Sequence, residues 1–285
     1  MAGFEIVYRC NEGSNPLRSA PSDAVAARAR LDEGNRKFAS LFVTPPVAEA
    51  IAARCVVPTD FSLAGNGLAV QSPFAAVLGC ADARVPVELI FNVGPNDIFV
   101  VRVAGNGLGP DVLGSLRYAI EHLGGSLKVI AVLGHSGCGA VSAAVDVFLN
   151  PSEYLALATS RAIRGILDQL TIVVHASARR LQQAFGQGVT SRPGYRTALI
   201  EMAVVTNAAA TAHSIQRAIR KHGAGDLMTL YGVYLLDSCH VWAPQLGSDD
   251  WSGLADAPAD VNSFSELADA VTRSARIAEL LDSER

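Results

Sequence analysis

Short apolar runs alternate with amphipathic stretches through the middle of the chain. Four of these runs are rich in β-branched or aromatic residues and lie between turn-forming residues, a pattern typical of buried strands. They cover residues 74–79, 97–103, 127–133 and 228–236. The stretches between them predict helices, including a long one over 197–221 that holds neither Pro nor Gly. Strands that alternate with helices favour a parallel sheet covered on both faces.

The predicted fold class is therefore α/β, with a mainly parallel central sheet of four strands and helices on both faces. A turn at 237–238 returns the chain into 240–242, which predicts an antiparallel edge strand. Helical extensions are expected at both ends: one from a cap at Ser22 and Asp23 to about residue 41, and one from a capping box that begins at Ser263. Chain breakers predict irregular structure for residues 1–20 and a loop after Pro46.

Charge is sparse and unevenly distributed. Only 18% of the residues are charged and 50% are hydrophobic, whereas globular proteins average about 25% charged residues. A large core and a sizeable subunit interface are therefore expected. The segment 243–285 holds nine acidic and three basic residues, which predicts a solvated acidic face. We expect one domain over 1–242, with an N-terminal helical arm, and an acidic helical extension over 243–285.

Composition also excludes several classes of protein. The chain has ample apolar surface, so it is not intrinsically disordered. It has no cluster of Lys and Arg of the kind that binds nucleic acid, and no unbroken apolar run long enough to span a membrane. Five cysteines without a secretory signal argue against a disulfide framework and for a reducing, cytoplasmic location.

The strongest chemical signal is divided between two strand ends. Cys80 follows the first predicted strand, and the sequence His135-Ser136-Gly137-Cys138 follows the third. The carboxyl ends of neighbouring parallel strands meet at one edge of the sheet, where ligands bind. Two thiolates and an imidazole suit zinc, and a set of three protein ligands leaves a fourth position open, as catalytic zinc sites do. Any one of these cysteines taken alone would more simply be a small core residue.

Asp82 and Arg84 lie beside the first of these ligands. An arginine can bind a carboxylate through two parallel hydrogen bonds, which would keep Asp82 ionised as a hydrogen-bond acceptor next to the metal. The alternative is an ordinary surface ion pair, which contributes only about 0–1 kcal/mol.

These motifs resemble those of the β-class carbonic anhydrases. That family carries Cys-x-Asp-Ser-Arg followed by His-x-x-Cys, and this chain matches both except that Ala83 replaces the serine. Residues 31–38, 99–106 and 230–234 are also similar to family segments, so the resemblance covers about residues 25–242. It implies reversible hydration of CO2 to bicarbonate and a proton by a zinc-bound hydroxide, with one Zn²⁺ per subunit.

The resemblance also assigns roles to individual residues. Cys80, His135 and Cys138 would bind zinc, and Asp82 with Arg84 would form the catalytic dyad that orients the hydroxide. The substrate would be bound by Gln71, Phe99, Ala104, Tyr118 and Gly139. Part of this pocket comes from a neighbouring subunit in the family, which implies a homodimer as the basic unit. Val77 stands where the bicarbonate-regulated branch has Trp, so the plant-like, open-site branch is expected.

Other functions are compatible with parts of the sequence. Related enzymes on the same zinc scaffold hydrolyse CS2 or COS, and a catalytically idle zinc fold could serve as a scaffold or a bicarbonate binder. Residues 134–138 resemble a serine-hydrolase elbow that lacks its final Gly. The glycines of 105–109 resemble a dinucleotide-binding turn with the wrong spacing, and a tight turn explains them better.

Overall fold

A twisted, mainly parallel β-sheet forms the centre of the molecule. The structure is a computed structural model that describes residues 4–10, 19–43, 53–59, 70–152, 154, 161–221, 227–244 and 251–283. The sheet has six strands in the order β4-β3-β5-β6-β7, and β8 also pairs with β6. The strands are β3 (Ala75–Gly79), β4 (Ile98–Arg102), β5 (Val129–His135), β6 (Met228–Tyr234), β7 (Val241–Trp242) and β8 (Ala255–Asp256).

Strand directions agree with the predicted fold class. The strands β4, β3, β5 and β6 run parallel, whereas β7 and β8 are antiparallel to β6. Every residue of β3 and β5 is buried, as expected for parallel strands covered on both faces. The prediction of four parallel strands and an antiparallel edge is confirmed, and β8 lengthens that edge.

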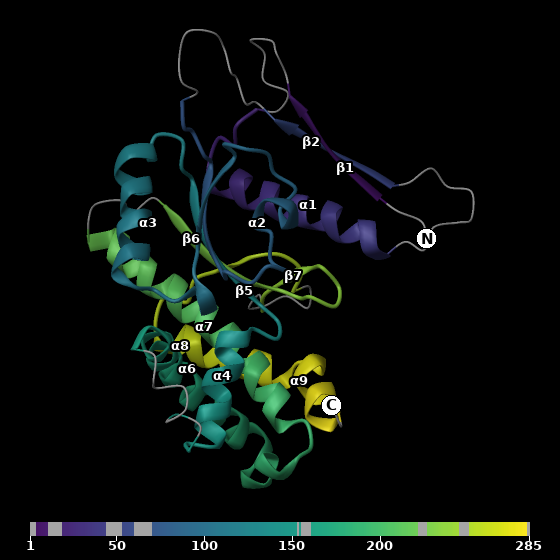
Figure 1. The fold of residues 1–285 in the computed structure, drawn as a ribbon, viewed down its shortest axis with the longest axis vertical. Helices are drawn as coiled ribbons and strands as arrows, with labels where there is room; N and C mark the ends of the chain where they lie inside the picture. Colours follow the sequence, from purple (N-terminus) through teal and green to yellow (C-terminus); the bar gives the residue numbers. More distant parts are fainter. Residues whose placement is uncertain are drawn as a thin grey trace.

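Helices cover both faces of this sheet (Figure 1). They are α1 (Ala24–Val43), α2 (Val87–Ile90), α3 (Pro110–Leu123), α4 (Gly139–Leu149), α6 (Arg161–Phe185), α7 (Tyr195–Lys221), α8 (Val261–Arg273) and α9 (Ala275–Asp282). Short 3₁₀ turns form η1 (Ala104–Asn106) and η2 (Gln187–Ser191). None of the helices in the described ranges is long and apolar enough to cross a membrane.

The two faces of the sheet belong to two separate apolar cores. Along β3, Ala75 and Val77 face the core that α1 and α2 close, whereas Ala76 and Leu78 face the larger core beneath α3, α4, α6 and α7. This alternation follows from the two-residue period of a strand. Cys80 and Cys138 belong to the larger core, so the candidate metal ligands lie on the α4 and α7 side of the sheet.

The prediction for the N-terminal region was wrong in two places. Residues 4–10 form the strand β1 (Phe4–Cys10), which pairs in parallel with β2 (Ala53–Thr59) as a separate sheet. Both segments contain alternating or β-branched apolar residues, which favour strands. The breakers at residues 11–16 lie after β1 and Pro45 and Pro46 lie before β2, whereas Pro58 falls near the end of β2 and does not prevent the strand.

The C-terminal segment is helical, as predicted, but its first helix begins earlier than expected. The N-cap is Asp260, whose carboxylate accepts a hydrogen bond from the backbone N–H of Ser263 at 2.9 Å. Aspartate is as good an N-cap as serine, and it starts the helix three residues upstream. Side chains of α8 and α9 enter the larger core, including Leu267 and Leu281. The division of the chain at residue 242 stays a prediction.

Close backbone packing of α9 against the start of α7 can be tested at Gly194. The N–H of Gly194 donates to the carbonyl oxygen of Leu281, and a Cβ added at Gly194 would overlap the carbonyl oxygen of Leu280. The substitution Gly194→Ala should lower the free energy of unfolding by about 1–3 kcal/mol, because backbone must move to make room. Chemical denaturation would measure the change.

Gly114→Ala is the matched control. Gly114 lies inside α3, where an added Cβ meets nothing within 4 Å. Alanine should stabilise the helix there by about 0.5–1 kcal/mol. Equal unfolding free energies for the two variants would contradict the packing of α9 on Gly194.

Candidate metal centre

Three potential metal ligands meet where β3, β5 and α4 come together. Cys80 follows β3, His135 is the last residue of β5, and Cys138 is the N-cap of α4. All three are buried, and one ligand atom from each lies within 4.8 Å of the other two. Gly137 has a φ of +60°, a conformation that glycine adopts without steric cost. This turn brings Cys138 back toward His135.

The orientation of His135 fits a metal ligand. Its Nδ1 lies 3.1 Å from the carbonyl oxygen of Ser136, which can only accept, so the ring proton resides on Nδ1. The lone pair is then on Nε2, which is buried and has no hydrogen-bond partner among the described residues. A histidine ligand commonly donates its other N–H to a carbonyl in this way. The orphaned Nε2 is therefore explained by coordination of a cation.

The two cysteines complete a donor set suited to zinc. Their sulfur atoms are 3.9 Å apart, and the backbone N–H of Gly105 in η1 donates to the Cys80 sulfur at 3.4 Å. The hydrogen bond with Cys138 lowers the pKa of Cys80, and the same contact raises the pKa of Cys138. Thiolate and neutral imidazole are the ligands that zinc prefers in tetrahedral sites. Cys80, His135 and Cys138 thus fit one Zn²⁺.

Asp82 lies beside these three ligands and is bound by Arg84. The Arg84 guanidinium donates to both carboxylate oxygens, from Nε at 3.0 Å and from Nη2 at 2.7 Å, and its backbone N–H donates at 2.9 Å. These hydrogen bonds hold the pKa of Asp82 well below its usual range. One carboxylate oxygen is 3.8 Å from Nε2 of His135. An ionised acceptor therefore points to the place where the metal would lie.

The residues expected to bind substrate divide into two groups. Ala104 is adjacent to Gly105, which touches the Cys80 sulfur, and Gly139 directly follows Cys138. Both are therefore sequence neighbours of residues that lie at the metal ligands. The other group, Gln71, Phe99 and Tyr118, is not brought to the metal site of its own chain.

Each member of this second group lies away from the carboxyl edge of the sheet. Gln71 is exposed before the amino end of β3, whereas Cys80 follows its carboxyl end. Phe99 pairs with Ala76, four positions before Cys80. Tyr118 is 49% exposed on α3, with its ring centroid 6.5 Å from that of Phe99.

Three polar residues that sequence reasoning missed support the loops around the ligands. Arg102 donates to the carbonyl oxygens of Cys80 and Asp82 at 2.9 and 2.5 Å. Asn207 of α7 donates to the carbonyl oxygen of Gly105 at 2.8 Å. Glu201 of α7 accepts from the N–H of Gly137 at 3.1 Å. In the sequence, Glu201 could have been noticed because it is the single charged residue within the apolar run of residues 198–205.

The serine-hydrolase alternative finds no support in the placement of Ser136. The Ser136 hydroxyl is buried and accepts a hydrogen bond from the backbone N–H of Leu236 at 2.9 Å. Asp237, the carboxylate that follows Leu236 in the chain, pairs with Arg276 at 3.2 Å. The glycines of 105–109 form η1 and the approach to α3, as expected of a tight turn.

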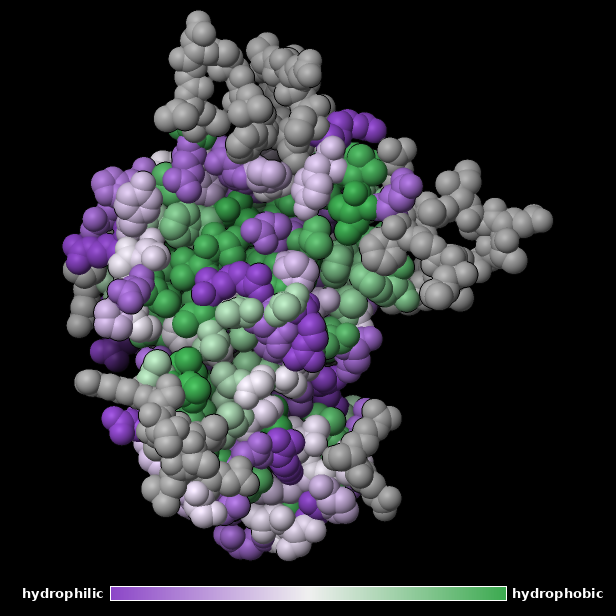
Figure 2. All heavy atoms as spheres, in the orientation of Figure 1, coloured by the Kyte–Doolittle hydropathy of each residue, from purple (hydrophilic) through white to green (hydrophobic). Residues whose placement is uncertain are grey.

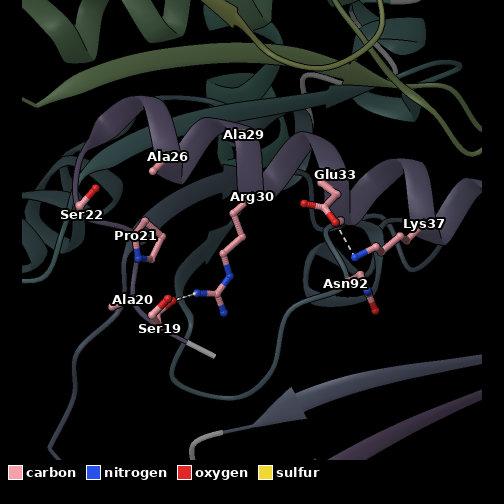
Figure 3. Close-up of a pocket in the computed structure, with 11 residues that line it drawn as sticks. Ser19, Ala20, Pro21, Ser22, Ala26, Ala29, Arg30, Glu33, Lys37 and Asn92 are labelled. Atoms are coloured by element: carbon pink, nitrogen blue, oxygen red, sulfur yellow. Dashed lines mark hydrogen bonds and ion pairs between the residues drawn. The ribbon is translucent and has the colours of Figure 1, made fainter. Parts of the chain in front are cut away.

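A hollow of about 720 Å³ lies apart from the metal ligands, between α1 and residues 19–22. Figure 3 shows the Arg30 side chain entering it and reaching Ser19. Arg30 also pairs with Asp97 at 2.9 Å and lies over the Phe74 ring at 4.5 Å. These contacts connect α1 to the amino ends of β3 and β4, so Arg30 has a structural role.

The fold and the donor set define a zinc site at the carboxyl edge of a parallel α/β sheet. A family model described as "Carbonic anhydrase" matches residues 75–238, which is more than half of the chain. The chain therefore belongs to the carbonic anhydrase family, and the resemblance to its β class is confirmed.

Similar proteins carry the same name. Carbonic anhydrase 2 of Mycobacterium tuberculosis is 42% identical over 125 residues, which are 44% of this chain and 54% of that protein. The carbonic anhydrase of Mycolicibacterium smegmatis is 35% identical over 150 residues, 53% of this chain and 64% of that one. The chain thus spans only about half to two thirds of the length of these relatives.

A solved structure of a Coccomyxa β-carbonic anhydrase in complex with acetazolamide also aligns with the chain. Its TM-score is 0.47 at 24% identity, and the match covers 62% of this chain and 72% of that chain.

The metal centre predicts one zinc per chain. Cys138→Ser should reduce bound zinc below about a tenth of an equivalent after chelator treatment, because a hydroxyl is a far poorer zinc ligand than a thiolate. Metal analysis of the purified protein measures this. Cys239→Gly is the control, because Cys239 is not one of the three ligands and glycine suits its φ of +60° in the β6–β7 turn. This variant should keep its zinc. A full equivalent of zinc in Cys138→Ser would contradict the site.

Proposed function

We propose that this protein catalyses the reversible hydration of CO2 to bicarbonate and a proton. The observation that carries the proposal is the Asp82–Arg84 pair, held beside the Cys80, His135 and Cys138 side chains. A structural zinc site needs no ionised carboxylate aimed at the metal position. Zinc in such a site would lower the pKa of a bound water and supply a nucleophile near neutral pH.

The residues of the chain have distinct roles in this proposal. Asp82 accepts a hydrogen bond from the nucleophile and orients its lone pair toward the carbon of CO2. Arg84 keeps Asp82 ionised and fixes its carboxylate plane through two hydrogen bonds. The backbone N–H of Gly139, at the first turn of α4, is available to a substrate oxygen. Both carboxylate oxygens of Asp82 accept hydrogen bonds from Arg84. Asp82 is therefore engaged by Arg84 rather than by the metal, which supports the open-site form of the enzyme.

The substrate pocket would be completed by a second copy of the chain. Gln71 and Tyr118 are exposed and remote from the metal ligands of their own chain. The same side chains can reach the metal site of a partner that packs against this face. Gln71 would donate to a substrate oxygen, while Phe99 and Tyr118 would shield CO2 from water.

Two features support such a pairing. The strand β4 lies at the edge of the six-stranded sheet, and an unpaired edge strand is a template for association. Figure 2 shows apolar side chains across the middle of the face in view, between α3 and α1. On α3, the Leu113 and Tyr118 side chains are exposed. An apolar face that becomes buried in a dimer also agrees with the low proportion of charged residues.

A cytoplasmic location remains part of the proposal. Cys80, Cys138 and Cys239 carry free thiols, which supports a reducing compartment.

Substitution of Asp82 tests the chemistry separately from the metal. Asp82→Asn should lower the rate of CO2 hydration by about 10²-fold or more, because the variant loses the ionised acceptor that positions the nucleophile. Zinc content should stay at one equivalent, since the three ligands are unchanged. Stopped-flow hydration and metal analysis on the same sample provide the measurement. Zinc-loaded wild-type protein without CO2 hydration would refute the proposed function and favour an idle zinc fold.

Complementation between two inactive variants tests the shared pocket. Asp82→Asn and Gln71→Ala should each be impaired, yet a mixed dimer holds one site with both residues intact. Random exchange of subunits should therefore restore about a quarter of the wild-type activity. Light scattering establishes that dimers form. Mixtures no more active than the average of the two separate variants would place Gln71 in its own chain's site or outside the pocket.

A further inference from the structure

The loop that carries two of the three zinc ligands makes an unusual contact with a buried carboxylate. Gly137 lies between His135 and Cys138 and has a left-handed conformation, with a φ of +60°. Its backbone N–H donates to Oε1 of Glu201, at 3.1 Å. The loop is thus held from behind by a side chain of α7, 64 residues later in the sequence.

A glutamate at this buried position is energetically unfavourable unless its charge is paired. The Glu201 side chain is only 9% exposed, and burial raises its pKa above the ordinary value for glutamate, while Arg276 and the Gly137 N–H act in the opposite direction. A buried carboxylate is strongly destabilising unless it is paired and hydrogen-bonded. Both oxygens are in fact used: Oε1 by Gly137, and Oε2 by Arg276.

Arg276 connects this carboxylate to the C-terminal helix. It is the second residue of α9, and both its Nε and its Nη2 donate to Oε2 of Glu201 at 3.3 Å. Its Nη1 donates to Asp237, just after β6, at 3.2 Å. A chain of contacts therefore runs from α9 through Arg276 and Glu201 to the zinc-ligand loop. Figure 1 shows α9 lying close to α7 at the lower end of the molecule.

A purely structural role for this network is the simpler alternative. Glu201 would then tie α9 to α7, as other ion pairs tie the tail to the body. Those pairs, such as Arg192–Asp282 at 3.6 Å, join exposed side chains at the surface. The Glu201–Arg276 pair differs because it is mostly buried and because the second carboxylate oxygen contacts the ligand loop itself. Residues behind the ligands of a metal commonly control its affinity.

We propose that Glu201 is a positioning residue of the zinc site, and that Arg276 of the C-terminal helix holds it in place. Glu201 fixes the Gly137 peptide plane, and with it the direction from which Cys138 and His135 approach the metal. The segment after residue 242 then contributes to the zinc site without touching the metal. The catalytic consequence rests on the proposed function, whereas the effect on the metal does not.

The experiment measures zinc loss to an excess of chelator, together with the visible spectrum of the cobalt-substituted protein, which reports ligand geometry. Glu201→Leu removes the acceptor and should release zinc about tenfold faster than wild type, with shifted cobalt bands. Glu201→Gln keeps an acceptor for Gly137 and should stay within about threefold of wild type. Arg276→Gln should fall between these two variants, because it leaves Glu201 in place but unpaired.

Arg192→Gln is the matched control, since it removes an ion pair between the body and α9 without touching Glu201. It should release zinc at the wild-type rate. All rates are compared well below each variant's unfolding midpoint. Release from Glu201→Leu at the rate of Arg192→Gln would overturn the proposal. If Glu201→Leu does not fold, equal rates for Arg276→Gln and Arg192→Gln would overturn it.

Both readouts remain decisive if wild-type protein does not hydrate CO2. In that case the proposed function fails, while the release rates and cobalt spectra still decide the role of Glu201.

Discussion

The zinc site depends on the parallel pairing of β3 with β5. Gly79 at the end of β3 is level with Leu133 of β5, and neighbouring strands lie about 4.8 Å apart. Cys80 comes directly after Gly79, and His135 lies two residues after Leu133, so strand pairing delivers both ligands to the same edge of the sheet. A slip of one residue in this register would turn one ligand to the opposite face of the sheet. The burial of both strands on both faces makes such a slip costly.

The third ligand and the dyad need more than strand pairing, because they lie on loops. Each of these loops is held by a side chain from a regular element or its end. Arg102 of β4 binds the backbone around Asp82, Asn207 of α7 binds the turn that contacts Cys80, and Glu201 of α7 binds the turn before Cys138. Loops tied in this way position functional groups more accurately than free loops can. The same hydrogen bonds satisfy buried backbone groups, which would otherwise destabilise the fold.

Local signals explain which parts were predictable from the sequence. The apolar runs of β3 and β5 and the spacing of His135 and Cys138 are features of short segments, and parallel pairing joins them without further information. The partners of Gly137 could not be predicted, because Glu201 and Arg276 are remote in sequence and their contact depends on how α7 and α9 pack. The N-terminal strands were missed because nearby breakers outweighed short strand signals. The roles of Gln71 and Tyr118 came only from the family resemblance, and a single chain does not bring them to the metal.

The position of the C-terminal segment follows from its apolar residues rather than from its charge. Apart from Glu201–Arg276, several of its ion pairs with the body join exposed groups, such as Arg192–Asp282 and Arg180–Asp269, and pairs of this kind contribute about 0–1 kcal/mol each. In contrast, α8 and α9 bury four large apolar side chains: Leu267, Val271, Ile277 and Leu281. Each contributes about 1.5–3 kcal/mol when fully buried. Salt that screens the exposed pairs should therefore leave α9 docked. The acidic residues provide solubility on the outer face, and the partly buried Arg276 stays where it can hold Glu201 behind the zinc loop.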